Sequence, residues 1–263
     1  LLHGAEVTIP GRIPFVASTL RYVLRRAVVV VSSGTYPEAE AVRNARRPLA
    51  AMLQIHPGVD IDRFTPLTPS AQASVRREMG FAEGDFLIAS YSRLVPRKGM
   101  DVLIRAAALL RDEIPNLVVA IGGSGRDRER LERLASDLNA PVTFIGRVSD
   151  ELLPRWLAAS DLMVMACRSR WFGLEQEGFG IVFAEASACG VAVIAGRSGG
   201  SHDAVIHDNP RSEAELADAI RALYLDPERR RAMGLAGRHH AEAAFDWNTL
   251  ARQLDKGLES LGG

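Results

Sequence analysis

Short apolar runs rich in β-branched residues alternate along the chain with stretches whose apolar positions recur at helical spacing. In the stretch 100–111, for example, Leu103, Ala106 and Leu110 fall on one face of a helix. Strand and helix alternating at this pace predict an α/β fold, in which helices cover both faces of a parallel sheet. The pattern predicts strands at residues 28–32, 52–55, 86–91, 117–121, 142–145, 162–165 and 191–195.

A break in this alternation divides the chain. Residues 57–69, PGVDIDRFTPLTP, are rich in proline and carry no periodicity, so we expect them to link two domains. The stretch before them holds the end of one α/β unit, and the stretch up to about residue 240 holds a fuller one. An amphipathic helix is predicted at 247–261. The alternation also requires a strand before the helix that begins near Ser212. Because none is found, we expect a segment to be missing around 207–210.

Composition narrows the class of protein. Hydrophobic residues make up 47% of the 263 residues and charged residues 24%, as is usual for a soluble globular protein. The formal net charge is zero, which disfavours nucleic acid as a partner. Cys167 and Cys189 stand in apolar surroundings, and we expect buried free thiols in a reducing compartment. No secretory signal and no apolar run of ~18 residues are visible, so the expected location is the cytoplasm.

Two cations follow the predicted strand 86–91. Arg93 and Lys98 lie five positions apart in SRLVPRKG, where Pro96 and Gly99 restrict the loop. Connections between parallel strands are right-handed, so this loop falls at the edge where such sheets bind ligands. Arginine can donate to two oxygens and lysine supplies a point charge, which together suit a diphosphate. By itself the pattern fits a solvated basic loop equally well.

A glycine-rich stretch, IGGSGRD at residues 121–127, follows the next predicted strand. The main-chain amide of Gly125 could approach a phosphate or a sugar closely, ahead of a helix that we expect from about Arg126. Arg128 stands where the third glycine of GxGxxG would fall. Dinucleotide binding is therefore only weakly indicated, and a plain tight turn fits the pattern better.

Residues 175–190, EQEGFGIVFAEASACG, include two glutamates that stand eight positions apart, Glu177 and Glu185. A helix is predicted at 181–188, and its N-terminal amides, which follow Gly180, favour a phosphate. Glu177 precedes the helix and can reach a sugar, whereas Glu185 lies ~10 Å further along and suits a ribose diol. The alternative is an acid that favours the helix dipole and a second acid on a solvated face. The apolar neighbours of Glu185 leave little polar face, which favours a ligand.

The motifs SRLVPRKG, FIGRVSDELL, EGFGIVFAEA, SACGVAVIAG and SGG, in this order, resemble those of the retaining glycosyltransferases of family 4. This family has the GT-B fold, so the resemblance implies an α/β protein with two Rossmann-like, doubly wound domains. It implies that 1–62 are a remnant of the N-terminal acceptor-side domain, which is largely missing from this chain. Residues 63–245 would form the nucleotide-sugar-binding domain, and the helix in 246–263 would pack back toward the first domain.

The resemblance also assigns roles to single residues. Arg93 and Lys98 match the diphosphate-binding pair of the family. Glu177 matches the glutamate beside the donor sugar, and His3 matches a histidine that the N-terminal domain projects toward that sugar. These four are the expected catalytic residues. The residues expected to bind the nucleotide sugar are Gly125, Val148, Asp150, Phe179, Gly180, Ile181, Val182 and Glu185.

A narrower resemblance, carried by SRLVPRKG, CRSR and EGFGIVFAEA, is to actinobacterial mannosyltransferases that act on phosphatidylinositol mannosides. It implies transfer of a hexose, mannose from GDP-mannose, to a hydroxyl of a glycan or glycolipid acceptor, without a further cofactor or a metal. A UDP-sugar-dependent member of the family and a non-catalytic nucleotide-sugar-binding module are the alternatives. An NAD-dependent oxidoreductase and a glycogen phosphorylase-like enzyme fit less well, because an intact GxGxxG and a cofactor lysine are not found.

The N-terminal part of the chain carries an excess of positive charge. Residues 1–50 hold seven arginines against three acids. A cationic amphipathic segment of this kind can rest on anionic lipid at the inner face of the plasma membrane. It can equally be a solvated helix face, so membrane contact is an expectation that the sequence leaves open.

Overall fold

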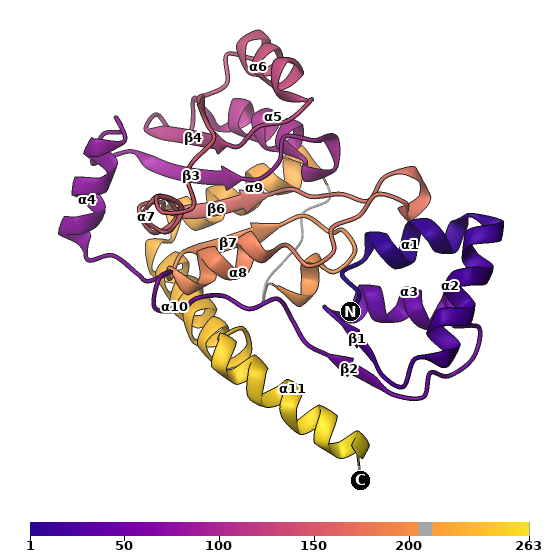
Figure 1. Ribbon diagram of the computed structural model, residues 1–263. Helices are drawn as coiled ribbons and strands as arrows, with labels where there is room; N and C mark the ends of the chain where they lie inside the picture. The colour runs from indigo at the N-terminus through magenta and orange to yellow at the C-terminus, as the bar shows by residue number, and fades with distance from the viewer. Residues whose placement is uncertain (205–211, 263) are drawn as a thin grey trace.

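Five parallel strands form the larger sheet. In the computed structural model, which describes residues 1–204 and 212–262, they lie in the order β5-β4-β3-β6-β7 (Figure 1). The chain moves from β3 outward to β5 and then returns to place β6 on the other side of β3. The direction of winding therefore reverses between β3 and β6, and ligands bind at such a switch point. The strands are β3 (Phe86–Tyr91), β4 (Leu117–Gly122), β5 (Val142–Gly146), β6 (Leu162–Met165) and β7 (Ala192–Ala195).

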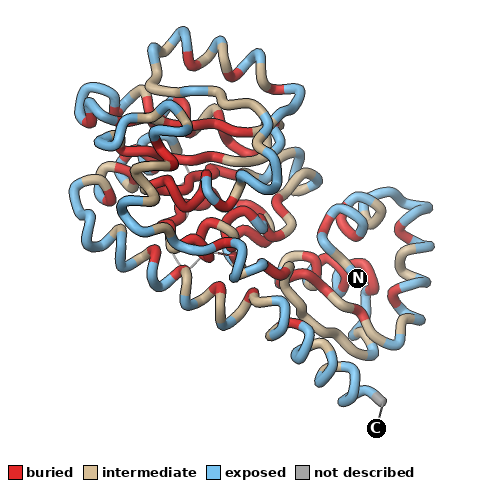
Figure 2. Tube along the Cα trace, turned by 60° about the vertical axis from the view of Figure 1, so that its left-hand side comes forward, coloured by how far each residue is buried: buried red, intermediate tan, exposed pale blue. Residues whose placement is uncertain are grey.

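Helices cover both faces of this sheet, as right-handed crossovers require (Figure 1). Helices α5 and α6 pack together on one face, where α9 also packs against α5, and α7 and α8 pack together on the other. Buried residues gather along the strands between these layers (Figure 2). The helices are α4 (Pro69–Glu78), α5 (Met100–Leu110), α6 (Arg128–Asp137), α7 (Leu153–Ala158), α8 (Ile181–Ala188), α9 (Glu213–Leu225), α10 (Pro227–Ala244) and α11 (Trp247–Gly262).

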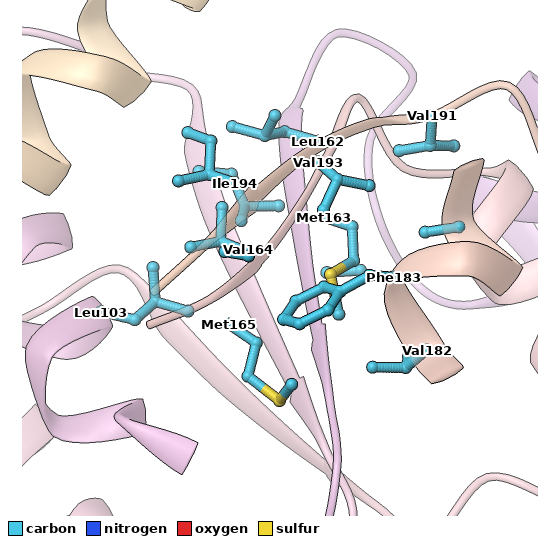
Figure 3. Close-up of a cluster of buried hydrophobic side chains, with 14 of the residues drawn as sticks. Leu103, Leu162, Met163, Val164, Met165, Val182, Phe183, Val191, Val193 and Ile194 are labelled. Atoms are coloured by element: carbon cyan, nitrogen blue, oxygen red, sulfur yellow. The ribbon is translucent and has the colours of Figure 1, made fainter. Parts of the chain in front are cut away.

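Helix α8 is held firmly because it is apolar almost all round. Its Phe183 is fully buried and lies close to Met163 of β6 (Figure 3). Burying a phenylalanine side chain stabilises a fold by about 1.5–3 kcal/mol. Val182, on the neighbouring position, is also buried. This packing fixes the orientation of α8, so the N-terminus of the helix and the carboxylate of Glu185 have defined positions relative to the sheet.

The N-terminal unit is small. Its two parallel strands are β1 (Val30–Ser32) and β2 (Met52–Gln54), and Leu2 pairs with Ser32 alongside β1. Helices α1 (Ala5–Arg12), α2 (Pro14–Arg26) and α3 (Thr35–Ala45) pack together beside this sheet (Figure 1). A separate apolar cluster, which includes Val7, Leu24 and Val30, forms the core of this unit.

Several contacts join the two units. The guanidinium of Arg238 in α10 donates to the carbonyl oxygens of Ile61, Phe64 and Ala188, which fastens the linker to the end of α8. The carboxylate of Asp203 accepts hydrogen bonds from the main-chain N–H and the hydroxyl of Thr35, at the first residue of α3. A carboxylate at a helix N-terminus is favoured by the helix dipole. The linker is therefore fixed to the larger unit, and Asp203 and Thr35 join the two units directly.

The structure confirms the predicted α/β fold and each of the seven predicted strands, with ends that differ by at most two residues. Both cysteines are buried and free, as expected. The strand expected before Ser212, and the segment expected to be missing there, lie outside the described residues. The domain boundaries stay predictions, although Gly257 of α11 does lie against Leu53 of β2. None of the described helices is long and apolar enough to cross a membrane.

A close contact in the linker should make it sensitive to a single methyl group. A Cβ at Gly58 would lie 2.5 Å from the indole of Trp247, the first residue of α11. Gly58→Ala should therefore lower the free energy of unfolding by about 1–3 kcal/mol through overpacking. Urea denaturation measures this change. The control is Gly84→Ala, where a Cβ would meet open space. Equal stability of the two variants would contradict the contact.

Candidate active site

Five loops meet at one edge of the larger sheet, because all five strands are parallel and end there. The loop after β3 carries Arg93 and Lys98, and the loop after β4 carries Gly125. The loop after β5 carries Val148 and Asp150. The loop after β6 carries Glu177 and leads into α8. Except for His3, every residue predicted for the site lies in these loops or in α8.

A buried ion pair joins two of these loops across the switch point between β3 and β6. The Nζ of Lys98 donates to Oε2 of Glu177 at 2.6 Å, and each side chain is only 10% exposed. Gly99 ends the short turn η1 (Pro96–Lys98) with a φ of 71°, and a Cβ there would collide with the carbonyl of Ala166. The loops therefore approach each other so closely that only glycine fits at this position.

Arg97 is a second cation on the same carboxylate. Its Nη1 lies 3.4 Å from Oε2 of Glu177, and its side chain is 15% exposed. The main-chain N–H of Glu177 donates to the hydroxyl of Ser198, which fixes the position of the acid. Two cations facing one carboxylate leave an excess of positive charge, which suits an anionic ligand. Sequence analysis overlooked Arg97, although it stands next to Lys98 in the same turn.

Arg93 does not join this cluster. Its residue is exposed at the start of the loop after β3, and within residues 1–204 and 212–262 it makes no ion pair. The five-residue spacing therefore places one cation, Lys98, in the buried pair and leaves the other at the rim. The predicted role of Arg93 in binding a diphosphate stays a prediction.

The N-terminus of α8 lies beside the ion pair. Gly180 precedes the helix with a φ of 86°, and a Cβ there would lie 2.6 Å from the ring of Phe183. The first amides of a helix have no partner within it, so those of Ile181 and Val182 can receive an anion. The ring of Phe179 stacks on His56 at 5.2 Å, inside the core. Phe179 could therefore meet a ligand only through its main chain.

Glu185 lies further along α8, in an environment that disfavours its charge. Burial raises the pKa of this carboxyl from its ordinary value of 4.5 to about 7, opposed by the charge of Arg63 and assisted by that of Asp150. The guanidinium of Arg63, in the linker, also donates to the main-chain carbonyl of Asp150. The structure therefore places Asp150 and Arg63 near Glu185, and sequence analysis overlooked Arg63.

The remaining predicted residues contribute mainly through packing. A Cβ at Gly125 would collide with the carbonyl of Leu94, so this glycine allows the loops after β3 and β4 to touch. This observation favours the tight-turn interpretation of IGGSGRD. Val148 packs against the cluster formed by Leu87, Ala120 and Trp156. Neither observation tests binding of a nucleotide at these positions.

His3 reaches the site from the N-terminal unit. A Cβ at Gly178 would collide with its carbonyl oxygen, so the two units meet directly at the EGFG motif. A cavity of about 360 Å³ opens there, and its lining includes His3, Tyr36, Arg97 and Gln176. Another cavity of similar volume lies between β7, α9 and α10, but its lining is almost wholly apolar and includes none of the predicted residues. We therefore take the first cavity, here called the site cavity, as part of the candidate site.

Two solved structures share this architecture over almost the whole chain. Anabaena HepE in complex with UDP and glucose superposes with a TM-score of 0.83 at 23% identity, over 98% of this chain and 70% of that one. Sucrose-phosphate synthase from Thermosynechococcus elongatus superposes with a TM-score of 0.81 at 26% identity, over 98% of this chain and 66% of that one. The fold is therefore of the GT-B type, as predicted.

The model of the family "Glycosyl transferases group 1" matches residues 72–240. A GDP-mannose-dependent α-(1-6)-phosphatidylinositol monomannoside mannosyltransferase of Mycolicibacterium smegmatis is 40% identical over 260 residues, covering 96% of this chain and 67% of that protein. A GDP-mannose-dependent monoacylated α-(1-6)-phosphatidylinositol monomannoside mannosyltransferase of Corynebacterium glutamicum is 42% identical, covering 98% of this chain and 68% of that protein. The chain belongs to the group 1 glycosyltransferases, and it spans about two thirds of the length of these relatives.

The buried pair predicts a specific pattern of unfolding energies. Lys98→Met leaves the buried carboxylate of Glu177 with Arg97 alone, and removing one partner of a buried pair costs about 3–5 kcal/mol. Lys98→Met combined with Glu177→Gln should be less destabilised than the sum of the two single variants, with a coupling on the order of 2 kcal/mol. Urea unfolding of the four proteins measures this coupling. Additive energies would show that the pair does not interact.

At pH values at which Glu185 is ionised, its carboxylate should lower the folding stability of the chain. Its pKa is raised in the folded chain, so folding stability falls as pH rises from about 4.5 through about 7. Glu185→Gln has no charge to bury, and above pH 7 it should be more stable than the natural chain by on the order of 2 kcal/mol. Thermal unfolding across this pH range measures the difference. The control, Glu83→Gln, removes an exposed carboxylate and should leave the pH slope unchanged. A lower melting temperature of Glu185→Gln at every pH would contradict the account.

Proposed function

We propose that this chain forms the donor-binding part of a retaining glycosyltransferase that transfers mannose from GDP-mannose to a hydroxyl of a phosphatidylinositol mannoside. The observation that carries this proposal is the buried cluster of Lys98, Arg97 and Glu177 at the switch point of the sheet. The names of the two mannosyltransferase relatives support the choice of donor and acceptor. The nucleotide-sugar donor and the glycolipid acceptor are thus inferred from the similarity to these relatives and from the charge of the site.

In this proposal Glu177 is the resting counter-ion of Lys98. A donor diphosphate carries more negative charge than one carboxylate and competes with Glu177 for the ammonium group. Arg97 stays within reach of Glu177, so the acid keeps a partner after Lys98 has turned to the diphosphate. Glu177, released from the lysine, can then accept a hydrogen bond from a hydroxyl of the donor sugar.

The proposed reaction follows from where negative charge develops. The bond between the anomeric carbon and the phosphate oxygen breaks, and Arg93, Lys98 and the first amides of α8 stabilise the departing diphosphate. An oxocarbenium-like sugar forms. The acceptor hydroxyl attacks the anomeric carbon from the face that the diphosphate leaves, and its proton passes to the departing phosphate oxygen. The configuration of the anomeric carbon is therefore retained. In this reaction no metal neutralises the charge of the diphosphate.

The other predicted residues hold the two ends of the donor. Glu185 accepts hydrogen bonds from the ribose diol, with Asp150 and Val148 on the side of the base. His3 faces the transferred sugar from the N-terminal unit, across the site cavity. An acid whose charge is disfavoured by its surroundings, as that of Glu185 is, is typical of a functional site. A lipid acceptor would also place the protein at the cytoplasmic face of a membrane, where the arginine-rich residues 1–50 favour anionic lipid.

Kinetics with GDP-mannose test the proposal through the exposed cation. Arg93→Ala should lower kcat/KM roughly 30- to 1000-fold, which corresponds to the loss of about 2–4 kcal/mol of transition-state stabilisation. The melting temperature should not fall. The control is Arg77→Ala, which removes an exposed arginine on α4. Transfer should persist in the presence of a chelator. Equal activity of the two variants would remove Arg93 from the site.

The same assay separates the alternatives. Transfer from GDP-mannose to a phosphatidylinositol mannoside supports the enzyme. Transfer from UDP-sugars alone would contradict the proposed donor. Calorimetric binding of GDP without any transfer or hydrolysis would show a nucleotide-sugar-binding module instead.

A further inference from the structure

A strained loop holds two aromatic side chains in solvent beside the site. The loop after β6 folds back on itself, since the N–H of Arg170 donates to the carbonyl of Glu175 at 2.9 Å. At its tip, in η2 (Trp171–Gly173), Trp171 and Phe172 have φ values of 48° and 53°. Bulky residues rarely adopt this left-handed conformation, which costs free energy.

Among the described residues, the strained backbone brings the two rings little packing. Phe172 is 102% exposed and Trp171 is 58% exposed. A large aromatic side chain in water forgoes the burial that would stabilise it. A strained backbone that presents two such rings to solvent therefore indicates a partner outside the chain.

The tip continues into an apolar strip on the N-terminal unit. The guanidinium of Arg12, at the end of α1, donates to the carbonyl of Phe172 at 3.3 Å, and in Figure 1 this loop reaches over α1. Ile9 and Ile13, one turn apart at the same end, are about half exposed. Leu174 and Ile9 both also line the site cavity. We call Ile9, Ile13, Trp171, Phe172 and Leu174 the aromatic tip, a surface that borders the mouth of the site.

Three arginines lie at the aromatic tip. The guanidinium of Arg170 lies over the ring of Trp171, 4.9 Å from its centroid, and Arg126 approaches Glu175 with a side chain that is 66% exposed. Arg12, which donates to the carbonyl of Phe172, adds a third guanidinium, and Glu175, the acid that pairs with Arg170 and Arg126, offsets part of this charge. Exposed aromatic rings beside three arginines match the interfacial region of an anionic lipid bilayer, where tryptophan and cations are both favoured.

We propose that the aromatic tip docks on an anionic lipid bilayer, with Trp171 and Phe172 entering the interface and Arg12, Arg126 and Arg170 on the headgroups. This inference rests on the proposed function, because a lipid acceptor must offer its headgroup to the site cavity while its acyl chains stay in the bilayer. Leu174 and Ile9 belong to both surfaces, so a headgroup would pass from the bilayer into the cavity without crossing open solvent. The location differs from the broad arginine excess of residues 1–50, since its apolar part comes mainly from the loop after β6.

Vesicle co-sedimentation of the full chain tests this surface. The natural chain should bind vesicles of phosphatidylglycerol mixed with phosphatidylcholine and bind pure phosphatidylcholine weakly. Trp171→Ser combined with Phe172→Ser should reduce partitioning to the anionic vesicles about tenfold, because two aromatic rings no longer enter the interface. The matched control is Leu225→Ser combined with Leu235→Ser, which removes two exposed apolar side chains from α9 and α10. Equal binding by the two double variants would overturn the proposal.

A second measurement holds even if the double serine variant folds poorly. Brominated lipid should quench part of the tryptophan fluorescence of the natural chain, and Trp171→Phe should abolish that part while Trp156 and Trp247 remain. Quenching that persists in Trp171→Phe would contradict insertion of the tip. Loss of a dimer in sedimentation velocity without lipid, on Trp171→Ser and Phe172→Ser, would assign the surface to a second copy of the chain and overturn the proposal.

Calorimetry with GDP separates this inference from the proposed function. Vesicle binding through the tip without GDP binding would refute the proposed function and leave the lipid-docking surface standing. If the chain binds GDP, and if replacing Trp171 and Phe172 leaves vesicle binding unchanged, the lipid-docking surface alone is refuted.

Discussion

The buried pair of Lys98 and Glu177 is the interaction on which the site depends. It joins the loops that follow β3 and β6, where the winding of the sheet reverses. The two loops lie so close there that only a glycine, Gly99, fits between them. Charges removed from water need partners, so each of these residues fixes the other. Arg97 adds a further positive charge, and the cluster is left ready for an anion.

Helix α8 supplies the second constraint. Phe183 and its apolar neighbours anchor the helix against β6, so the amides at one end and Glu185 at the other keep a fixed separation. The cost of this arrangement falls on Glu185, whose charge is disfavoured by burial. Stability alone would favour a neutral side chain at this position. Its presence is explained when the carboxylate receives the hydroxyl groups of a ligand.

Sequence analysis succeeds where the determinants are local. Periodicity predicts the strands of the sheet, and the glycine before α8 predicts where the helix begins, because both depend on neighbouring residues. It cannot decide which of Arg93 and Arg97 turns toward Glu177, since that depends on how two loops distant in sequence pack. Arg63 was overlooked for the same reason, because its partner Asp150 lies on another loop. No sequence pattern predicts the left-handed backbone conformation of Phe172.

The central claim is that Glu177 holds Lys98 only until a diphosphate displaces it. A crystal structure of the chain with bound GDP tests this claim most directly. The account predicts the Nζ of Lys98 on an oxygen of the diphosphate, with Arg97 still beside Glu177. A nucleotide bound elsewhere, or an unchanged contact between Lys98 and Glu177 under a bound diphosphate, would contradict it.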